Sequence, residues 1–158
     1  MPRAASGVQL QSPSRKSPQS RRPRLVDAVV DTNILVSGLI RRDSPPAEVL
    51  RAIELRLLRP VVCNAVVTEY RDVLGRPRLA LPSEDVAHLI DLMISIAVWV
   101  HVPDYTGVPA LPDPADWPFV ACALAVGCPV ITGNLKHSPA GSGVRVMTAR
   151  EWVGYQVP

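Results

Sequence analysis

The chain has 158 residues, 47% of them hydrophobic, so it is long enough to bury the core of one domain and short for two. Its three cysteines include no Cys-x-x-Cys pair, which excludes a zinc ribbon and a disulfide scaffold and favours a reducing, cytoplasmic location. The net charge of +3 comes from residues 1–24, which contain six basic residues and no acid and leave eleven basic against fourteen acidic residues elsewhere.

Residues 1–24 are rich in serine, proline and arginine and hold too little apolar surface to offset the entropy lost on ordering. We therefore expect a disordered basic tail, followed by one folded domain over residues 25–158. The tail lacks the continuous apolar stretch of a secretory signal, although its acid-free start resembles an organelle transit peptide. An arm that binds phosphates is the alternative to an unstructured extension.

Short apolar, β-branched runs alternate with helical patterns from residue 25 onward. The predicted strands cover residues 25–30, 61–63, 98–102, 130–132 and 144–146. The predicted helices cover residues 34–40, 47–58, 64–74, 84–96, 114–126 and 149–153. Asn64 and Ser83 are the expected N-caps of two of these helices, and a Pro- and Gly-rich loop covers residues 103–112.

This alternation predicts an α/β protein with a parallel sheet that is covered on both faces. The longest apolar run, residues 94–100, is far shorter than the roughly 20 residues that cross a bilayer, so we expect no membrane span. In parallel sheets of this kind, ligands bind beyond the carboxyl ends of the strands. The polar residues at those ends are therefore the candidate site residues.

Two carboxylates lie at positions where a bound cation would neutralise their charge. Asp31 follows the first predicted strand, beside Thr32 and Asn33, and capping of the next helix is its structural alternative. Glu69 lies on the apolar stripe of a predicted helix, where an unpaired buried carboxylate is costly. Its alternative is a position at the edge of the stripe, in contact with water.

Two more polar positions follow later in the chain. Asp113 and Asp116 flank Pro114, a pattern typical of a helix start, with Asp113 at the cap and Asp116 in the first turn. Asn134 follows the predicted strand 130–132, and a plain turn residue after Gly133 is an equal interpretation. Since both segments can reach the carboxyl edge of the sheet, Asp113 and Asp116 can face Asp31.

Four blocks in order resemble PIN-domain nucleases, most closely the branch of toxins from bacterial toxin–antitoxin modules. The blocks are residues 30–37 (VDTNILVS), 68–74 (TEYRDVL), 113–119 (DPADWPF) and 132–137 (TGNLKH). The similarity spans residues 26–140 and leaves out the tail. Each block alone is weak, whereas four in this order and spacing are specific.

The resemblance implies a three-layer α/β/α sandwich with a central parallel sheet and a ribonuclease site that uses Mg²⁺ or Mn²⁺. It implies Asp31, Glu69 and Asp116 as catalytic residues, with Asp113 as a further metal ligand. The auxiliary residues that it implies are Asp113, Asn134, Thr32 and Asn33. Many relatives carry an aspartate at the position of Asn134, so one metal ion is expected here rather than two.

An acidic pocket attracts RNA only if nearby cations bind the backbone phosphates. The candidate RNA-binding residues are Arg41, Arg71, Lys136 and His137. Arg42, Arg76 and Arg78 also follow strand ends or flank the site, and solvated surface charge is the alternative for each of these residues. The implied partners are RNA and a cognate antitoxin that inserts a segment into the acidic groove, with a homodimer as a further possibility.

The leading hypothesis is a divalent-metal-dependent endoribonuclease that acts as a toxin. The alternative is a catalytically weakened module that binds RNA or a protein partner without cleavage, which Asn134 favours. A phosphatase of the haloacid dehalogenase type also places an aspartate after its first strand. It needs a second aspartate two residues later, where this chain has Asn33, so the sequence disfavours it.

Overall fold

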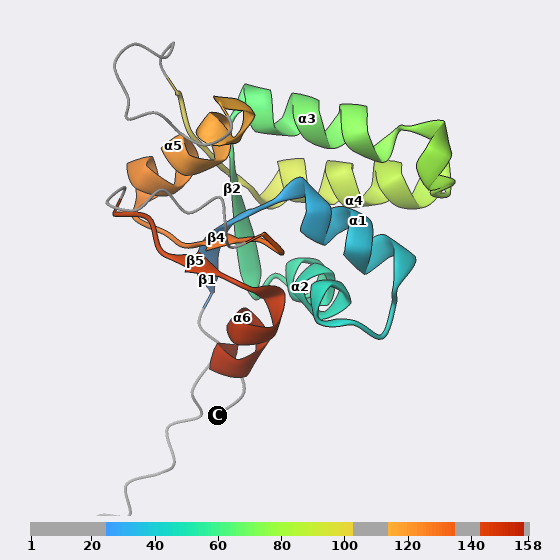
Figure 1. Ribbon diagram of the computed structural model, residues 1–158, viewed down its shortest axis with the longest axis horizontal. Helices are drawn as coiled ribbons and strands as arrows, with labels where there is room; N and C mark the ends of the chain where they lie inside the picture. The colour runs from blue at the N-terminus through green and yellow to red at the C-terminus, as the bar shows by residue number, and fades with distance from the viewer. Residues whose placement is uncertain (1–24, 103–113, 135–142, 157–158) are drawn as a thin grey trace, which may run out of the picture.

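The computed structural model describes residues 25–102, 114–134 and 143–156 (Figure 1). The predicted tail of residues 1–24 and the predicted loop of residues 103–112 lie outside these ranges. No helix within the described ranges is both long and apolar enough to span a bilayer.

The centre of the fold is a sheet of five strands in the order β3-β2-β1-β4-β5. Every neighbouring pair is parallel, which confirms the predicted sheet. The strands are β1 (Val26–Val30), β2 (Leu58–Val62), β3 (Val98–Trp99), β4 (Val130–Ile131) and β5 (Val146–Met147).

Helices cover both faces of this sheet, which gives a three-layer α/β/α fold. The α-helices are α1 (Thr32–Ile40), α2 (Pro45–Glu54), α3 (Asn64–Leu74), α4 (Ser83–Ile96), α5 (Trp117–Val126) and α6 (Ala149–Gln156). Two 3₁₀ turns, η1 (Pro77–Leu79) and η2 (Pro114–Asp116), precede α4 and α5. In Figure 1, α5 lies on one side of the sheet and α1, α2 and α4 lie on the other, while α6 packs against α2.

The strand order explains where a ligand can bind. The connections β1–β2 and β2–β3 run toward one edge of the sheet, whereas β4 pairs with the opposite side of β1. Because such crossovers are right-handed, α5 lies on the face opposite the earlier helices. The switch point between β1 and β4 opens a crevice at the carboxyl ends of these strands. The residues that follow β1 and β4 therefore border this crevice.

The strand sequences are apolar because helices cover both faces of the sheet. Ala28, Val29 and Val30 of β1 are fully buried, as are Val61 and Val62 of β2. Nearer the start of β1, Asp27 accepts two hydrogen bonds from Arg59 of β2, at 2.8 and 3.1 Å. This ion pair ties the two strands together at their register partners.

One predicted helix, residues 47–58, is wrong at its end. α2 stops at Glu54 because the chain turns through Arg56, which has a φ of 58°, and the Leu57 amide donates to the Ala52 carbonyl. β2 starts at Leu58 and contains Pro60, which pairs with β1 just before β2 meets β3. The strand predicted over residues 61–63 therefore begins earlier, at Leu58, and includes Pro60.

Several predicted helix starts also need correction. Cys63 and Pro82 are the N-caps of α3 and α4, so Asn64 and Ser83 are the first helical residues. The helix predicted from Pro114 begins as the 3₁₀ turn η2, and α5 starts at Trp117. A regular helix from Pro114 would place Pro118 where it has no N–H to donate and its ring clashes with the preceding turn.

Gly38 allows α1 and α2 to approach closely. A Cβ atom at this position would lie 2.7 Å from Leu50 Cδ1 and 2.9 Å from the Pro46 carbonyl oxygen. We expect Gly38→Ala to lower the free energy of unfolding by about 1–3 kcal/mol because the helices must move apart. Urea denaturation would show a lower midpoint at an unchanged slope.

Gly154→Ala is the matched control, because nothing lies within 4 Å of the added Cβ on α6. This change should be neutral or stabilising by up to about 1 kcal/mol. Equal midpoints for the two variants would contradict the close approach at Gly38.

Candidate active site

Asp31 connects the end of β1 to the end of β4. It occupies the N-cap position of α1, but its side chain makes no capping hydrogen bond. Instead, the Thr132 hydroxyl donates to Asp31 Oδ2 at 2.6 Å, and the Asp31 amide donates to the Ile131 carbonyl at 2.9 Å. Asp31 is therefore not a side-chain cap, and its carboxylate is oriented by the neighbouring strand.

Glu69 is held in a similar way from α1. It lies half-buried on α3, and the hydroxyl of the buried Thr32 donates to Glu69 Oε1 at 3.0 Å. Burial raises the pKa of Glu69, and the negative charges of Asp31 and Asp116 raise it further. The Thr32 hydrogen bond and the charge of Arg76 act in the opposite direction. The surroundings of Glu69 thus carry negative charge contributed by two other segments.

Asp116 completes this acidic group. It ends η2 and is the N-cap residue of α5. A pocket of about 360 Å³ is lined by Asp31, Glu69 and Asp116. The same pocket is also lined by Thr32, Asn33, Asn134, Val36, Val73, Leu79, Arg76 and Arg78. The fold therefore gathers residues from the ends of β1 and β4, from α3 and from the start of α5.

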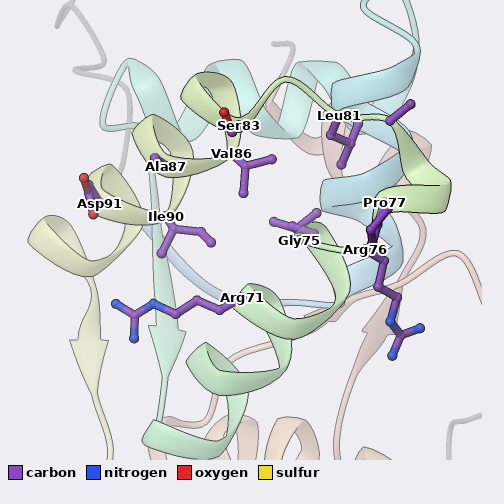
Figure 2. Close-up of a pocket in the computed structure, with 12 residues that line it drawn as sticks. Arg71, Gly75, Arg76, Pro77, Leu81, Ser83, Val86, Ala87, Ile90 and Asp91 are labelled. Carbon is purple, nitrogen blue, oxygen red and sulfur yellow. The ribbon is translucent and has the colours of Figure 1, made fainter.

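Of the other predicted site residues, Arg41 and Arg71 do not line this pocket. Asp113, Lys136 and His137 lie outside the described residues. Arg41 is exposed at the end of α1, whereas Arg71 lines a separate hollow of about 350 Å³ between α3 and α4 (Figure 2). The structure thus brings together the three predicted catalytic acids and the auxiliary residues Thr32, Asn33 and Asn134, but neither Arg41 nor Arg71.

Two residues that were not predicted as site residues, Thr132 and Tyr70, position parts of the candidate site. Thr132 is buried, orients Asp31 and also accepts a hydrogen bond from the Asn134 amide at 3.1 Å. The Tyr70 hydroxyl donates to the Val30 carbonyl, one residue before Asp31. A threonine that ends an apolar strand was a usable signal for the first residue. The sequence contained no sign of the role of Tyr70, because a tyrosine on the apolar stripe of a helix predicts a core residue.

The donor set suits a hard divalent cation. Carboxylate, hydroxyl and amide oxygens are the ligands that Mg²⁺ and Mn²⁺ prefer, and the mutual repulsion of the acids is a cost that a cation would offset. Within the described ranges, however, no three histidine, cysteine, aspartate or glutamate side chains are placed to hold a metal ion together. Since Mg²⁺ keeps several of its waters, a partly hydrated ion fits this pocket better than a closed cage of side chains.

The raised pKa of Glu69 predicts a specific pH dependence of stability. A carboxyl group whose pKa is higher in the folded state favours folding while it is protonated, and this contribution is lost as pH rises from about 4.5 through the folded pKa. With chelator present, Glu69→Gln should match the wild type at low pH and exceed its melting temperature at neutral pH. Melting curves across this range test the expectation.

The same exchange at the exposed Glu54 of α2 controls for the general loss of one negative charge. If the difference in melting temperature between Glu69→Gln and the wild type did not grow with pH, the burial and crowding of Glu69 would be contradicted.

Comparison with known proteins gives one result. A scan against protein-family models matches residues 27–136 to the PIN domain. Neither the curated proteins nor the solved structures gave a match. The matched segment begins in β1 and ends just beyond Asn134, so it contains each acid of the pocket.

Proposed function

The chain belongs to the PIN-domain family, and we propose that it is a divalent-metal-dependent endoribonuclease. PIN domains are generally nucleases and bind nucleic acid. The observation that carries the proposal is that Asp31, Glu69 and Asp116, from three distant segments, line one pocket at the carboxyl edge of the sheet. This is the place where parallel α/β sheets bind their ligands.

Asp31, Glu69 and Asp116, with Asp113, would hold a partly hydrated cation, some of them through its bound waters. When bound, the cation would supply the Lewis acid for phosphodiester hydrolysis and offset the charge that builds up in the transition state. The chain's own contribution is orientation. Thr132 and Thr32 each donate to one oxygen of a carboxylate, which restricts the rotation of Asp31 and Glu69. The side-chain amide of Asn134 adds a neutral polar group at the same edge.

The test is a cleavage assay with the purified full chain. A panel of structured and single-stranded RNAs is incubated with Mg²⁺, with Mn²⁺ and with excess EDTA, and the products are mapped. The proposal expects internal cleavage that requires the cation. Cleavage that persists in EDTA, or the absence of cleavage under every condition, would contradict it.

We further propose that the chain acts as a toxin in the cytoplasm and is inhibited by a cognate antitoxin. The support is the resemblance of the four sequence blocks to the toxin branch. An antitoxin segment inserted into the acidic pocket would block access to Asp31 and Glu69. Growth arrest on expression, abolished by Asp31→Asn and relieved by a gene encoded next to this one, tests the role. Light scattering of the purified chain tests the proposed homodimer.

A second candidate function is RNA or protein binding without cleavage. Asn134 brings no charge to a position where many relatives carry an acid, and no three described histidine, cysteine, aspartate or glutamate side chains are placed to hold a metal ion together. A module that only binds has no need of a tight cation site, so cation affinity separates the two functions.

Thr132→Val should lower the rate of cleavage by about tenfold to 100-fold while the fold is kept. Valine has nearly the shape of threonine, but it cannot donate to Asp31 or accept from the Asn134 amide. Measured kcat for the variant should fall, whereas Ser95→Ala, which removes an exposed hydroxyl of α4 that does not line the pocket, should leave kcat unchanged. An unaltered kcat in Thr132→Val would remove Thr132 from the account.

A further inference from the structure

The acidic pocket has a cationic wall. Arg76 and Arg78, on the connection between α3 and α4, line the same pocket of about 360 Å³ as Asp31, Glu69 and Asp116. Three carboxylates by themselves repel a nucleic acid, whose backbone carries a negative charge at every phosphate. The two guanidinium groups are the cations that line this pocket within the described residues, and each has the fork geometry that suits phosphate oxygens.

A short, hydrogen-bonded turn fixes the backbone of these two arginines. Pro77 begins η1, the Leu79 amide donates to the Arg76 carbonyl at 3.0 Å, and the Ala80 amide donates to the Pro77 carbonyl at 3.0 Å. Ala80 then leaves the turn with a φ of 49°. Because Pro77 presets the backbone, Arg76 and Arg78 are held on a stiff support rather than on a free loop.

The side chains of Arg71 and Arg76 extend in opposite directions. Figure 2 shows Arg71 and Arg76 leaving the hollow between α3 and α4 on its two sides. Arg76 is near enough to Glu69 that its charge lowers the pKa of that carboxyl, against the effect of burial. Of these two arginines, Arg76 therefore serves the acidic pocket and Arg71 does not.

Both guanidinium groups are available to an anion. Arg76 forms an ion pair with Asp72 at 3.1 Å, but the two side chains are 43% and 70% exposed, so the pair is weak and a phosphate can replace it. Arg78 is exposed, and the described residues form no ion pair with it.

We propose that Arg76 and Arg78 form the phosphate-binding subsite of this pocket and hold the backbone of a single-stranded nucleic acid beside the three acids. The inference rests on the proposed function for the role of the bound strand as substrate. It goes beyond that function by assigning the residues that bind the nucleic-acid backbone and by excluding Arg71 from this subsite.

The test measures the salt dependence of binding. A fluorescent single-stranded RNA is titrated with the full chain in EDTA at several salt concentrations, for the wild type and for Arg76→Ala and Arg78→Ala. For single strands, each lost phosphate contact should reduce the slope of log K against log salt by about 0.7. Arg78→Lys should restore the slope, since it keeps the charge, and Arg150→Ala, exposed on α6, is the matched control.

A second readout separates binding from chemistry. With Mg²⁺ or Mn²⁺ present, Arg78→Ala should raise KM severalfold and leave kcat within about twofold of the wild type, because uniform binding is lost. Circular dichroism checks that each variant is folded.

Unchanged slopes in both alanine variants would overturn the inference, as would a reduced slope in Arg71→Ala alone or no RNA binding by the wild type. If the RNA bound with the expected arginine dependence but was cleaved with no cation, the subsite would stand and the nuclease proposal would fail. If cleavage required the cation but was insensitive to both arginines, the nuclease proposal would stand and the phosphate-binding subsite would fail.

Discussion

Asp31→Asn should reduce cation-dependent RNA cleavage by about 100-fold or more without unfolding the protein. Asparagine keeps the size of the side chain and an oxygen that accepts the hydrogen bond from Thr132, so the end of β1 stays in place. The exchange removes a full negative charge from the pocket that Glu69 and Asp116 share. Initial rates with Mg²⁺ or Mn²⁺, compared at equal protein concentration, measure the loss.

Asp43→Asn is the matched control for this experiment. Asp43 is exposed between α1 and α2 and does not line the acidic pocket. The control should cleave at the wild-type rate and melt at nearly the same temperature. Wild-type activity in Asp31→Asn would mean that the reaction takes place elsewhere on the chain.

Tyr70→Ala should cost about 3–5 kcal/mol of the free energy of unfolding, in the range of other large aromatic truncations. Tyr70 is 1% exposed, and its ring lies 6.2 Å from that of Phe119 on α5, tilted by 57°. Its hydroxyl donates to the Val30 carbonyl, so one side chain connects α3, α5 and the end of β1. Since these elements carry Glu69, Asp116 and Asp31, activity should be lost together with stability.

Tyr70→Phe separates packing from hydrogen bonding. Phenylalanine keeps the ring contact with Phe119 but leaves the Val30 carbonyl without this donor, a loss of about 1–2 kcal/mol. Burial raises the pKa of Tyr70 well above its ordinary value, so the hydroxyl remains a donor throughout the neutral range. Chemical denaturation of both variants tests the expectation, and equal losses would show that the ring itself contributes little.

The fold was predictable because its signals are local. Apolar, β-branched runs alternate with helical patterns, and this order alone favours a covered parallel sheet. The boundaries were not predictable to the same degree. Leu57 and Leu58 continue the helical pattern of α2 in sequence, but the left-handed turn at Arg56 and the pairing with β1 place Leu58 in β2. Tertiary pairing outweighs helix propensity there.

The acids of the candidate site could be proposed from the sequence, whereas most of the residues that orient them could not. Asp31, Glu69 and Asp116 came from strand ends, from the apolar stripe of α3 and from the family resemblance, and the structure places all three around one pocket. The hydrogen bond between Thr132 and Asp31 joins residues 101 positions apart, so no local pattern could reveal it. The division between Arg71 and Arg76 also depends on the direction of each side chain, which sequence spacing on a helix does not fix.

Calorimetric titration of Mn²⁺ into the metal-free protein tests most directly whether acids from three segments form one cation site. For the wild type, the proposed site predicts saturable binding of a single ion per chain. In Asp31→Asn the affinity should fall by about tenfold to 100-fold or more, since a ligand is lost rather than its support. Absence of binding by the wild type, or equal affinity in the variant, would contradict the assignment.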